Sequence, residues 1–245
     1  MKTINHFIDG KIYSDNKSRK GPIFNPAIGE QIAEVELASK STVEMAIESS
    51  SKAFQKWSKT TPINRARILA KFKDLLIQNM DNLAEMVSEQ HGKTIADAKG
   101  SIQRGIEVVE YATGITDSLK GDHSANVGTN VDSHTLRQPL GVCAGITPFN
   151  FPAMVPMWMF PVAIACGNSF VLKPSEKDPS CPMKLAELAI QAGLPPGVLN
   201  CVNGDKEAVD TLLENKTVQA ISFVGSTPIA EYVYHTGTKN NKRVQ

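Results

Sequence analysis

Three short segments in the second half of the chain carry residue types that could bind a nucleotide and stabilise a developing negative charge. Asn150 stands between two phenylalanines and two prolines, and a carboxamide held rigidly in such a turn could stabilise the oxyanion of a tetrahedral intermediate. Lys173 and Glu176 close an apolar run, and an ammonium beside a carboxylate can hydrogen-bond the two hydroxyls of a ribose. Gly225 and Ser226 precede a predicted helix, whose N-terminal dipole favours a phosphate.

Each of these patterns also has an ordinary structural interpretation. A lone asparagine in a turn often bonds its own backbone, and a lysine three residues from a glutamate is commonly a surface ion pair. No GxGxxG motif follows a predicted strand, and this absence argues against the ordinary short-chain and lactate-type dehydrogenases. What the three segments share is that each follows a predicted strand.

Short apolar runs alternate with helical patterns from residue 140 onward. Strands are predicted at 140–147, 169–173, 198–202 and 218–224, and helices at 151–166, 181–192 and 206–214. Such alternation predicts βαβ units and therefore a parallel sheet with helices on both faces. Because ligands bind outside the carboxyl ends of the strands in an open parallel sheet, we expect the three segments to lie at that edge.

The first 120 residues contain short strands followed by amphipathic helices. Turn signals such as Asp9-Gly10 separate alternating apolar positions in the first forty residues, which predicts short strands. Helices are predicted to start at the capping box Ser41 to Glu44, at Thr61-Pro62, near Asn82 and near Thr94. The last of these helices carries Arg104 opposite its apolar stripe, where an arginine is usually a solvated surface charge.

A change of composition separates the two halves of the chain. Residues 121–138 are polar and β-prone around the turn signal Gly128-Thr129-Asn130, which predicts a protruding hairpin. The predicted organisation is N-terminal strands and helices over 1–120, the hairpin over 121–139, and a Rossmann-like nucleotide-binding unit over 140–245.

The 245-residue chain has a balanced composition: 41% of residues are hydrophobic, and 26 Lys and Arg face 25 Asp and Glu. This balance gives no reason to expect nucleic acid or an anionic membrane as a partner. The N-terminus resembles neither a secretory signal nor an organelle presequence, and the most apolar stretch, 151–166, is too short to span a membrane, so we expect a cytoplasmic protein. Four cysteines without CxxC spacing give no support for a metal site or a disulfide framework.

The three segments together resemble the aldehyde dehydrogenase superfamily. They are Thr147 to Pro152, Val171 to Glu176 and Phe223 to Thr227, in the order and spacing of that family. The resemblance implies a Rossmann-like parallel sheet of the aldehyde dehydrogenase type with flanking helices, and Asn150 as the oxyanion donor. It also implies NAD as the cofactor, bound by Thr147, Pro148 and Phe149, by Lys173 and Glu176 at the adenine ribose, and by Gly225 and Ser226 at the pyrophosphate. The Glu176 carboxylate would repel a 2′-phosphate, which favours NAD over NADP.

Further segments, among them 5–10, 92–100 and 104–110, resemble the CoA-acylating methylmalonate-semialdehyde dehydrogenase branch of this family. That branch oxidises malonate or methylmalonate semialdehyde with NAD and coenzyme A to acetyl-CoA or propionyl-CoA, and Arg104 matches the arginine that contacts the carboxylate of the semialdehyde. Family members assemble partly through the hairpin, so we expect a homo-oligomer. A hydrolytic NAD-dependent aldehyde dehydrogenase and a non-catalytic nucleotide-binding or oligomerising remnant remain alternatives.

The resemblance further implies that full-length relatives continue well beyond Gln245. Their catalytic domain and nucleophilic cysteine would follow this residue, so we expect an incomplete nucleotide-binding unit, truncated before the catalytic domain, and no activity from the 245-residue chain alone. Among the four cysteines, Cys181 is the one candidate for reactivity, because it starts a predicted helix and a helix N-terminus can lower the pKa of a thiol.

Overall fold

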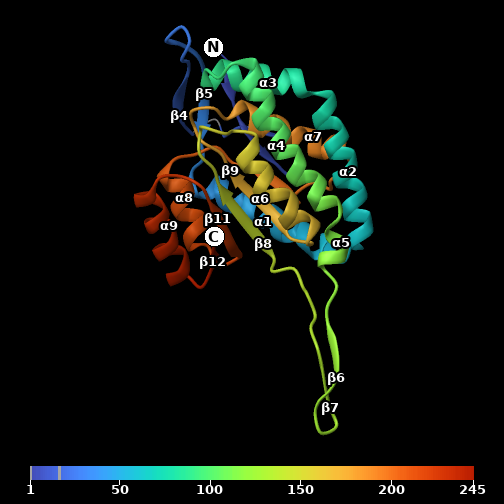
Figure 1. The fold of residues 1–245 in the computed structure, drawn as a ribbon. Helices are drawn as coiled ribbons and strands as arrows, with labels where there is room; N and C mark the ends of the chain where they lie inside the picture. The colour runs from blue at the N-terminus through green and yellow to red at the C-terminus, as the bar shows by residue number, and fades with distance from the viewer. Residues whose placement is uncertain (1, 16–17) are drawn as a thin grey trace.

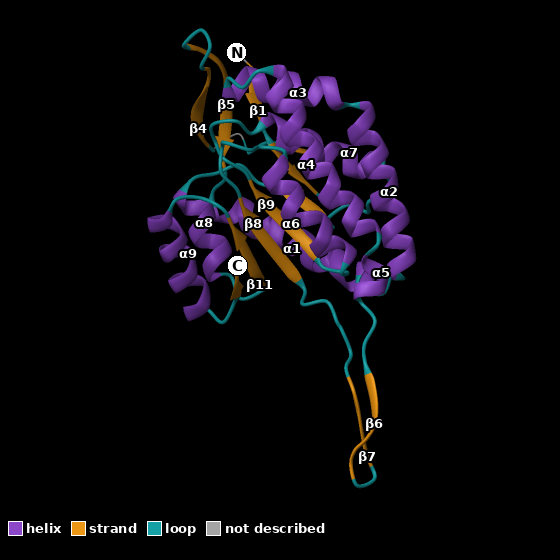
Figure 2. Cartoon of the chain, viewed as in Figure 1, coloured by secondary structure: helices purple, strands orange, loops and turns teal. Residues whose placement is uncertain are grey.

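A seven-stranded sheet runs through the molecule and carries helices on its two faces (Figures 1 and 2). The computed structural model describes residues 2–15 and 18–245. In chain order, the elements are β1 (Lys2–Ile4), β2 (His6–Ile8), β3 (Lys11–Tyr13), β4 (Arg19–Asn25), β5 (Glu30–Leu37), α1 (Lys40–Trp57), α2 (Pro62–Gln78), α3 (Met80–His91), α4 (Ile95–Thr113), α5 (Ile115–Ser118), β6 (His123–Gly128), β7 (Val131–His134), β8 (Val142–Ile146), α6 (Met154–Ala165), β9 (Ser169–Lys173), α7 (Ser180–Gln191), β10 (Leu199–Cys201), α8 (Lys206–Glu214), β11 (Val218–Phe223), α9 (Thr227–Lys239) and β12 (Arg243–Val244).

The large sheet has the strand order β12-β11-β8-β9-β10-β2-β3. From β12 to β10 all neighbouring strands are parallel, whereas β2 pairs antiparallel with both β10 and β3. A smaller sheet has the order β1-β5-β4. The predicted α/β fold, with a parallel sheet and flanking helices, is therefore confirmed, and β2 and β3 add the start of the chain to the same sheet.

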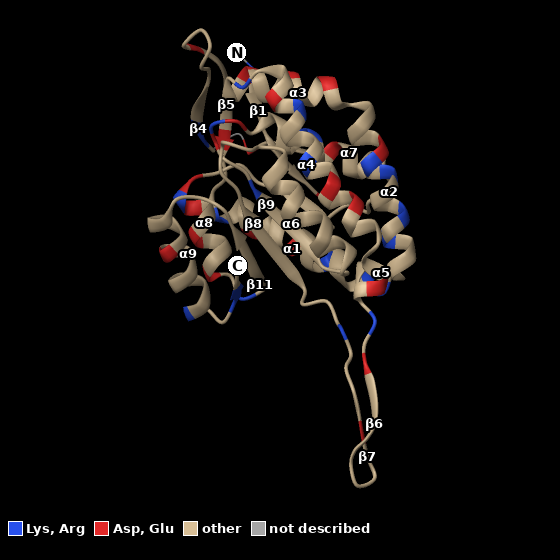
Figure 3. Cartoon of the chain, viewed as in Figure 1, with Lys and Arg blue, Asp and Glu red and all other residues tan. Residues whose placement is uncertain are grey.

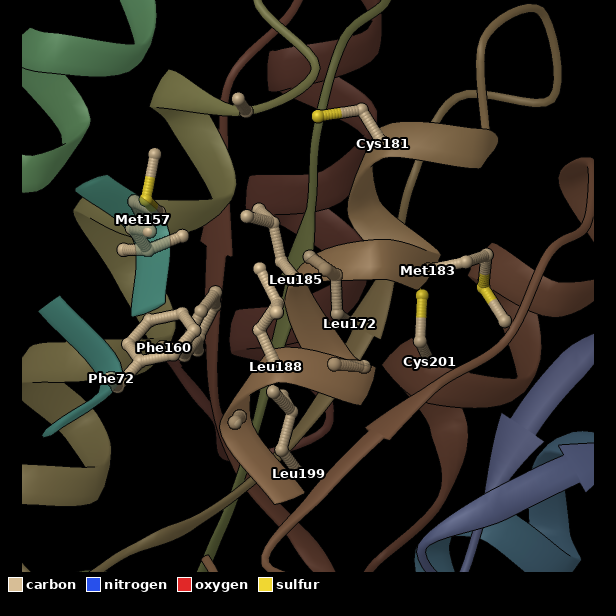
Figure 4. Close-up of a cluster of buried hydrophobic side chains, with 14 of the residues drawn as sticks. Phe72, Met157, Phe160, Leu172, Cys181, Met183, Leu185, Leu188, Leu199 and Cys201 are labelled. Atoms are coloured by element: carbon tan, nitrogen blue, oxygen red, sulfur yellow. The ribbon is translucent and has the colours of Figure 1, made fainter. Parts of the chain in front are cut away.

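Side chains of the central strands alternate between two apolar layers. On β9, Phe170 and Leu172 pack in a cluster with residues of α2, α4, α6 and α7, part of which is shown in Figure 4. Val171, between them, packs in a second cluster with residues of α1, α8 and α9. Because both faces of these strands are buried, each strand must be apolar on both sides, and it appears in the sequence as a continuous apolar run.

The helix boundaries follow local signals at most of the predicted positions. Helix α2 begins at Pro62, α3 ends before Gly92, which has a φ of 84°, and Thr94 caps α4 by accepting from the backbone N–H of Asp97 at 3.2 Å. The predicted capping box at Ser41 is wrong. Helix α1 begins two residues earlier, and its cap is Ser39, whose Oγ accepts from the N–H of Thr42 at 3.4 Å.

A tertiary contact explains the earlier start of α1. The N–H of Ala38 donates to the carbonyl oxygen of Asn203 at 2.9 Å. This bond fixes the chain beside the end of β10, so that the turn into the helix occurs at the next residue. The sequence carries no local mark of that contact, because the two residues are far apart along the chain.

The segment predicted as a hairpin forms β6 and β7, which project away from the helices and the sheet (Figure 1). The side chains of both strands are exposed. Charges of both signs are interspersed over the helices (Figure 3). Within residues 2–15 and 18–245, no helix is both long and apolar enough to cross a membrane, and no cluster of three or more His, Cys, Asp or Glu is arranged to hold a metal.

Candidate functional site

The three segments selected from the sequence meet at one edge of the large sheet. Ile146, the last residue of β8, is paired with Lys173 at the end of β9 and with Phe223 at the end of β11. Hydrogen bonds continue this row by one residue: the N–H of Thr147 donates to the Lys173 carbonyl at 3.1 Å, and the N–H of Val224 donates to the Ile146 carbonyl at 3.2 Å. The segments after the three strands therefore start side by side.

The order of the strands makes this edge a candidate binding site. The chain runs from β8 to β9 and β10 on one side, and then returns to form β11 on the other side of β8 (Figure 1). The connections leave β8 and β11 toward opposite sides at their carboxyl ends. Open α/β sheets bind ligands at such a switch point.

Lys173 and Glu176 form a pair at the end of β9. The Lys173 Nζ donates to Glu176 Oε2 at 3.2 Å, and the two side chains are 7% and 41% exposed. The ammonium is thus largely covered while the carboxylate reaches the surface. A ligand hydroxyl at this point could accept from the lysine and donate to the glutamate.

Asn150 lies on the exposed turn between β8 and α6. Thr147 is buried and its hydroxyl has no hydrogen-bond partner in the part of the chain that the structure describes; Pro148 is partly buried, and Phe149 is 47% exposed. Within the described residues, nothing hydrogen-bonds the Asn150 carboxamide. Its N–H groups are consequently available to a ligand.

The phenylalanines on both sides of Asn150 contact other elements. The Phe149 ring stacks on His91 with 6.1 Å between the ring centroids, and the Lys177 Nζ lies 4.8 Å from the centre of the same ring. The Phe151 ring has the Lys93 Nζ 3.7 Å from its centre. Burial, together with the charge of Lys93, lowers the pKa of His91 below its ordinary value.

Arg104 is exposed on α4, as predicted, and it lies beside the Asn150 turn. Its guanidinium carbon is 5.9 Å from the centre of the Phe151 ring. The neighbouring residue, Gly105, allows this approach. A Cβ there would collide with the Met157 side chain and lie 3.2 Å from the Met154 Cα, so glycine lets α4 pack closely on α6.

Lys93 is the residue of this site that the sequence did not reveal. Its Nζ donates a hydrogen bond to the backbone oxygen of Asn150, and it also covers the Phe151 ring. The sequence offered one signal, the Gly92-Lys93-Thr94 stretch at a predicted helix start, but this stretch carries no indication of a partner 57 residues away.

Gly225 and Ser226 form the turn between β11 and α9. Ser226 is the N-cap residue of α9, but its side chain makes no capping hydrogen bond. A Cβ on Gly225 would come within 2.5 Å of the Phe223 ring. The turn therefore combines a glycine, an uncommitted hydroxyl and a helix N-terminus, which suits a phosphate.

None of the four cysteines has the environment of a nucleophile. Burial raises the pKa of all four thiols, that of Cys143 to about 11. The prediction that Cys181 could be reactive is wrong. This residue does start α7, but its side chain is fully buried among apolar groups (Figure 4), and the nearby Asp178 raises its pKa further.

The sequence pattern of the aldehyde dehydrogenase family matches residues 13–245. The chain belongs to the aldehyde dehydrogenase family. The three segments at the sheet edge lie within the matched residues. The resemblance that they indicated is therefore confirmed.

Relatives within the aldehyde dehydrogenase family are similar over the whole chain. Malonate-semialdehyde dehydrogenase of Pseudomonas aeruginosa is 56% identical over 245 residues, which are 100% of this chain and 49% of that protein. The crystal structure of methylmalonate-semialdehyde dehydrogenase from Oceanimonas doudoroffii matches with a TM-score of 0.98 and 56% identity, covering 100% of this chain and 50% of that one. A Sinorhizobium meliloti 1021 protein, solved complexed with NAD, matches with a TM-score of 0.97 and 55% identity over the same shares. The chain thus spans about half the length of these relatives.

Proposed function

We propose that residues 1–245 form the NAD-binding and oxyanion-stabilising part of a CoA-acylating malonate- or methylmalonate-semialdehyde dehydrogenase. The complete polypeptide would convert the semialdehyde, NAD and coenzyme A to acetyl-CoA or propionyl-CoA and NADH, with the substrate carboxylate leaving as carbon dioxide. The single observation that carries this proposal is the shared strand row of Ile146, Lys173 and Phe223, which brings a ribose-binding pair, a phosphate-binding turn and an oxyanion donor to one edge.

The described residues fit NAD. Lys173 and Glu176 present a covered ammonium and an accessible carboxylate 3.2 Å apart, which suits the two hydroxyls of a ribose. Gly225 stands next to the N-terminus of α9, at a position where a Cβ would collide with the Phe223 ring. A 2′-phosphate at the ribose would lie against the Glu176 carboxylate, and this repulsion favours NAD over NADP. When bound, NAD supplies the ring that accepts a hydride.

The residues around the Asn150 turn supply charge stabilisation. The Asn150 carboxamide would donate a hydrogen bond to the aldehyde oxygen as negative charge develops on it. Arg104, exposed beside the same turn, would bind the carboxylate of the semialdehyde through its planar fork of N–H donors. The high identity to a malonate-semialdehyde dehydrogenase supports this substrate class.

The proposal is tested with the complete polypeptide that carries this sequence. NADH absorbance and acyl-CoA mass are followed with malonate semialdehyde and NAD, with and without coenzyme A. We expect acetyl-CoA, carbon dioxide and NADH in equal amounts, all dependent on coenzyme A. Release of malonate without coenzyme A would instead support a hydrolytic aldehyde dehydrogenase, and NAD binding without turnover would support a non-catalytic remnant.

We also propose a cytoplasmic homo-oligomer in which the β6–β7 hairpin joins neighbouring subunits. The projection of the hairpin supports this, as do its exposed apolar side chains Val127 and Val131. Its edges could pair with a strand of a second copy.

A further inference from the structure

The backbone around Lys93 is fixed in a way that directs its ammonium toward the turn that carries Asn150. Its backbone oxygen accepts from the Ser88 hydroxyl at 2.7 Å, and Gly92, just before it, takes the left-handed conformation that ends α3. The following residue, Thr94, caps α4. The Lys93 backbone is therefore fixed between two helices, and the direction of its side chain is limited.

The contacts of the Lys93 ammonium go to the Asn150 turn and not to a carboxylate. The Nζ donates to the Asn150 backbone oxygen and lies 3.7 Å from the centre of the Phe151 ring. Lys93 makes no ion pair with any residue in the described ranges, although the charges of Asp178 and Asp97 influence it electrostatically. An ammonium bound to a carbonyl and an aromatic face restrains the peptide between them.

This restraint acts on the backbone from which the Asn150 side chain projects. The Asn150 oxygen belongs to the peptide plane that joins Asn150 to Phe151, so fixing the oxygen and the ring together fixes the orientation of that plane. On the other side of Asn150, the Phe149 ring is in contact with His91 and Lys177. Without Lys93, the Asn150 carbonyl oxygen would lose this donor, and the Phe151 ring would keep the more distant contact with Arg104, whose guanidinium carbon lies 5.9 Å from the ring centre.

We propose that Lys93 is a positioning residue that orients the Asn150 carboxamide toward the substrate oxygen. The inference rests on the proposed function, because it assigns Lys93 a role in the same oxyanion site. Lys93 itself does not touch the reacting atoms. It acts through the carbonyl oxygen of Asn150 and the ring of Phe151, so its removal lowers transition-state stabilisation and leaves substrate and cofactor binding in place.

The test is a double-mutant cycle in the complete polypeptide. Lys93→Met keeps the apolar stem and removes the donors, and we expect it to lower kcat by about 10- to 100-fold while KM for NAD and the semialdehyde changes by less than about threefold. Lys93→Arg, which retains a cation over Phe151, should restore most of the rate. Adding Lys93→Met to Asn150→Ala should cause little further loss, because the group that it positions is already gone. Lys71→Met, at an exposed position of α2, is the matched control.

Three outcomes would overturn the positioning role: an unchanged kcat in Lys93→Met, a selective rise of KM for carboxylated semialdehydes, or losses that add in the double variant. Failure of the proposed function is a separate result, since the unmodified polypeptide would then form no acyl-CoA. In that case the rate of amide hydrogen exchange in residues 149–153 tests whether Lys93 restrains the Asn150 turn. Faster exchange in Lys93→Met but not in Lys71→Met supports the restraint of the turn, and equal exchange refutes it.

Discussion

Arg104 is the exposed residue that we propose binds the carboxylate of the substrate. Its side chain is solvent-accessible, yet its guanidinium lies 5.9 Å from the Phe151 ring, next to the Asn150 turn. In the complete polypeptide, Arg104→Ala is expected to raise KM for malonate semialdehyde by about tenfold or more, because a charge-assisted, two-point contact to the carboxylate is lost. Steady-state kinetics with propanal, which lacks the carboxylate, should show little change.

The matched control for Arg104 is Arg67→Ala, which removes an exposed arginine of α2 that donates to the Asn64 side chain. This variant should leave KM unchanged for both malonate semialdehyde and propanal. If Arg104→Ala raises KM equally for propanal and for malonate semialdehyde, Arg104 does not recognise the carboxylate.

Asp178 is a buried carboxyl group, and within residues 2–15 and 18–245 neither of its oxygens has a hydrogen-bond partner. Burial raises its pKa from the ordinary 3.8 to about 9, against the attraction of Lys93. Between these two pH values the folded protein binds the extra proton, so the contribution of this group to the free energy of unfolding is present below pH 3.8 and is lost as the pH rises toward 9.

Asp178→Asn removes this dependence. We expect the variant to be more stable than the parent chain by on the order of 5 kcal/mol at pH 8, and about equally stable at pH 4. Urea unfolding at both pH values measures the difference. A variant that is less stable at pH 8 would mean that the ionised carboxylate is stabilised in the folded chain.

At the scale of elements, the contact between α4 and α6 places Arg104 beside the Asn150 turn. A Cβ at Gly105 would collide with Met157 and crowd the Met154 Cα at 3.2 Å. Gly105→Ala should therefore cost about 1–3 kcal/mol of stability as the helices separate. Gly100→Ala is its matched control, since no described residue beyond the adjoining backbone of the same helix lies within 4 Å of a Cβ at that position.

Thermal or urea unfolding of both alanine variants checks this prediction. Gly100→Ala should stabilise the chain by about 0.5–1 kcal/mol, because alanine has the higher helix propensity. A Gly105→Ala variant as stable as Gly100→Ala would show that the helices do not depend on this close approach.

Elements were predictable from the sequence wherever one residue or a continuous pattern determines the local conformation. Pro62, Gly92 and Thr94 mark helix ends that the structure has, and apolar runs mark the buried parallel strands. The cap of α1 was not predictable, because the bond between Ala38 and Asn203 sets its position. The environment of Cys181 was misjudged for a related reason: sequence shows that it starts a helix, but not which way the thiol faces.

The candidate site was predictable in part for the same physical reasons. The three segments after the strands could be found because the ends of parallel strands meet at one edge. Lys93 could not be assigned to this edge, since its contact with Asn150 depends on how α3 and α4 pack against the rest of the fold. Residues that reach the site from other helices have no fixed sequence spacing to the site residues, so their contacts cannot be predicted from sequence alone.

At the scale of the whole molecule, the described residues build a continuous sheet from both ends of the chain. Strands β2 and β3 close one side of the sheet and β12 the other, with the switch point between β8 and β11 inside. The segments that form the proposed NAD site therefore all lie within the described part of a chain that spans about half the length of its relatives.

The central claim is that these strand ends form an NAD site, and calorimetric titration of the 245-residue chain tests it most directly. We expect NAD to bind at one site per chain and NADP at least about tenfold more weakly. Glu176→Gln should weaken the binding of NAD and reduce the difference in affinity between NAD and NADP. The control is Glu187→Gln on α7, where the glutamate pairs with Lys184 at 3.0 Å, and it should change neither quantity. Equal affinity for NAD and NADP, or NAD binding unaffected by Glu176→Gln, would contradict the proposed site.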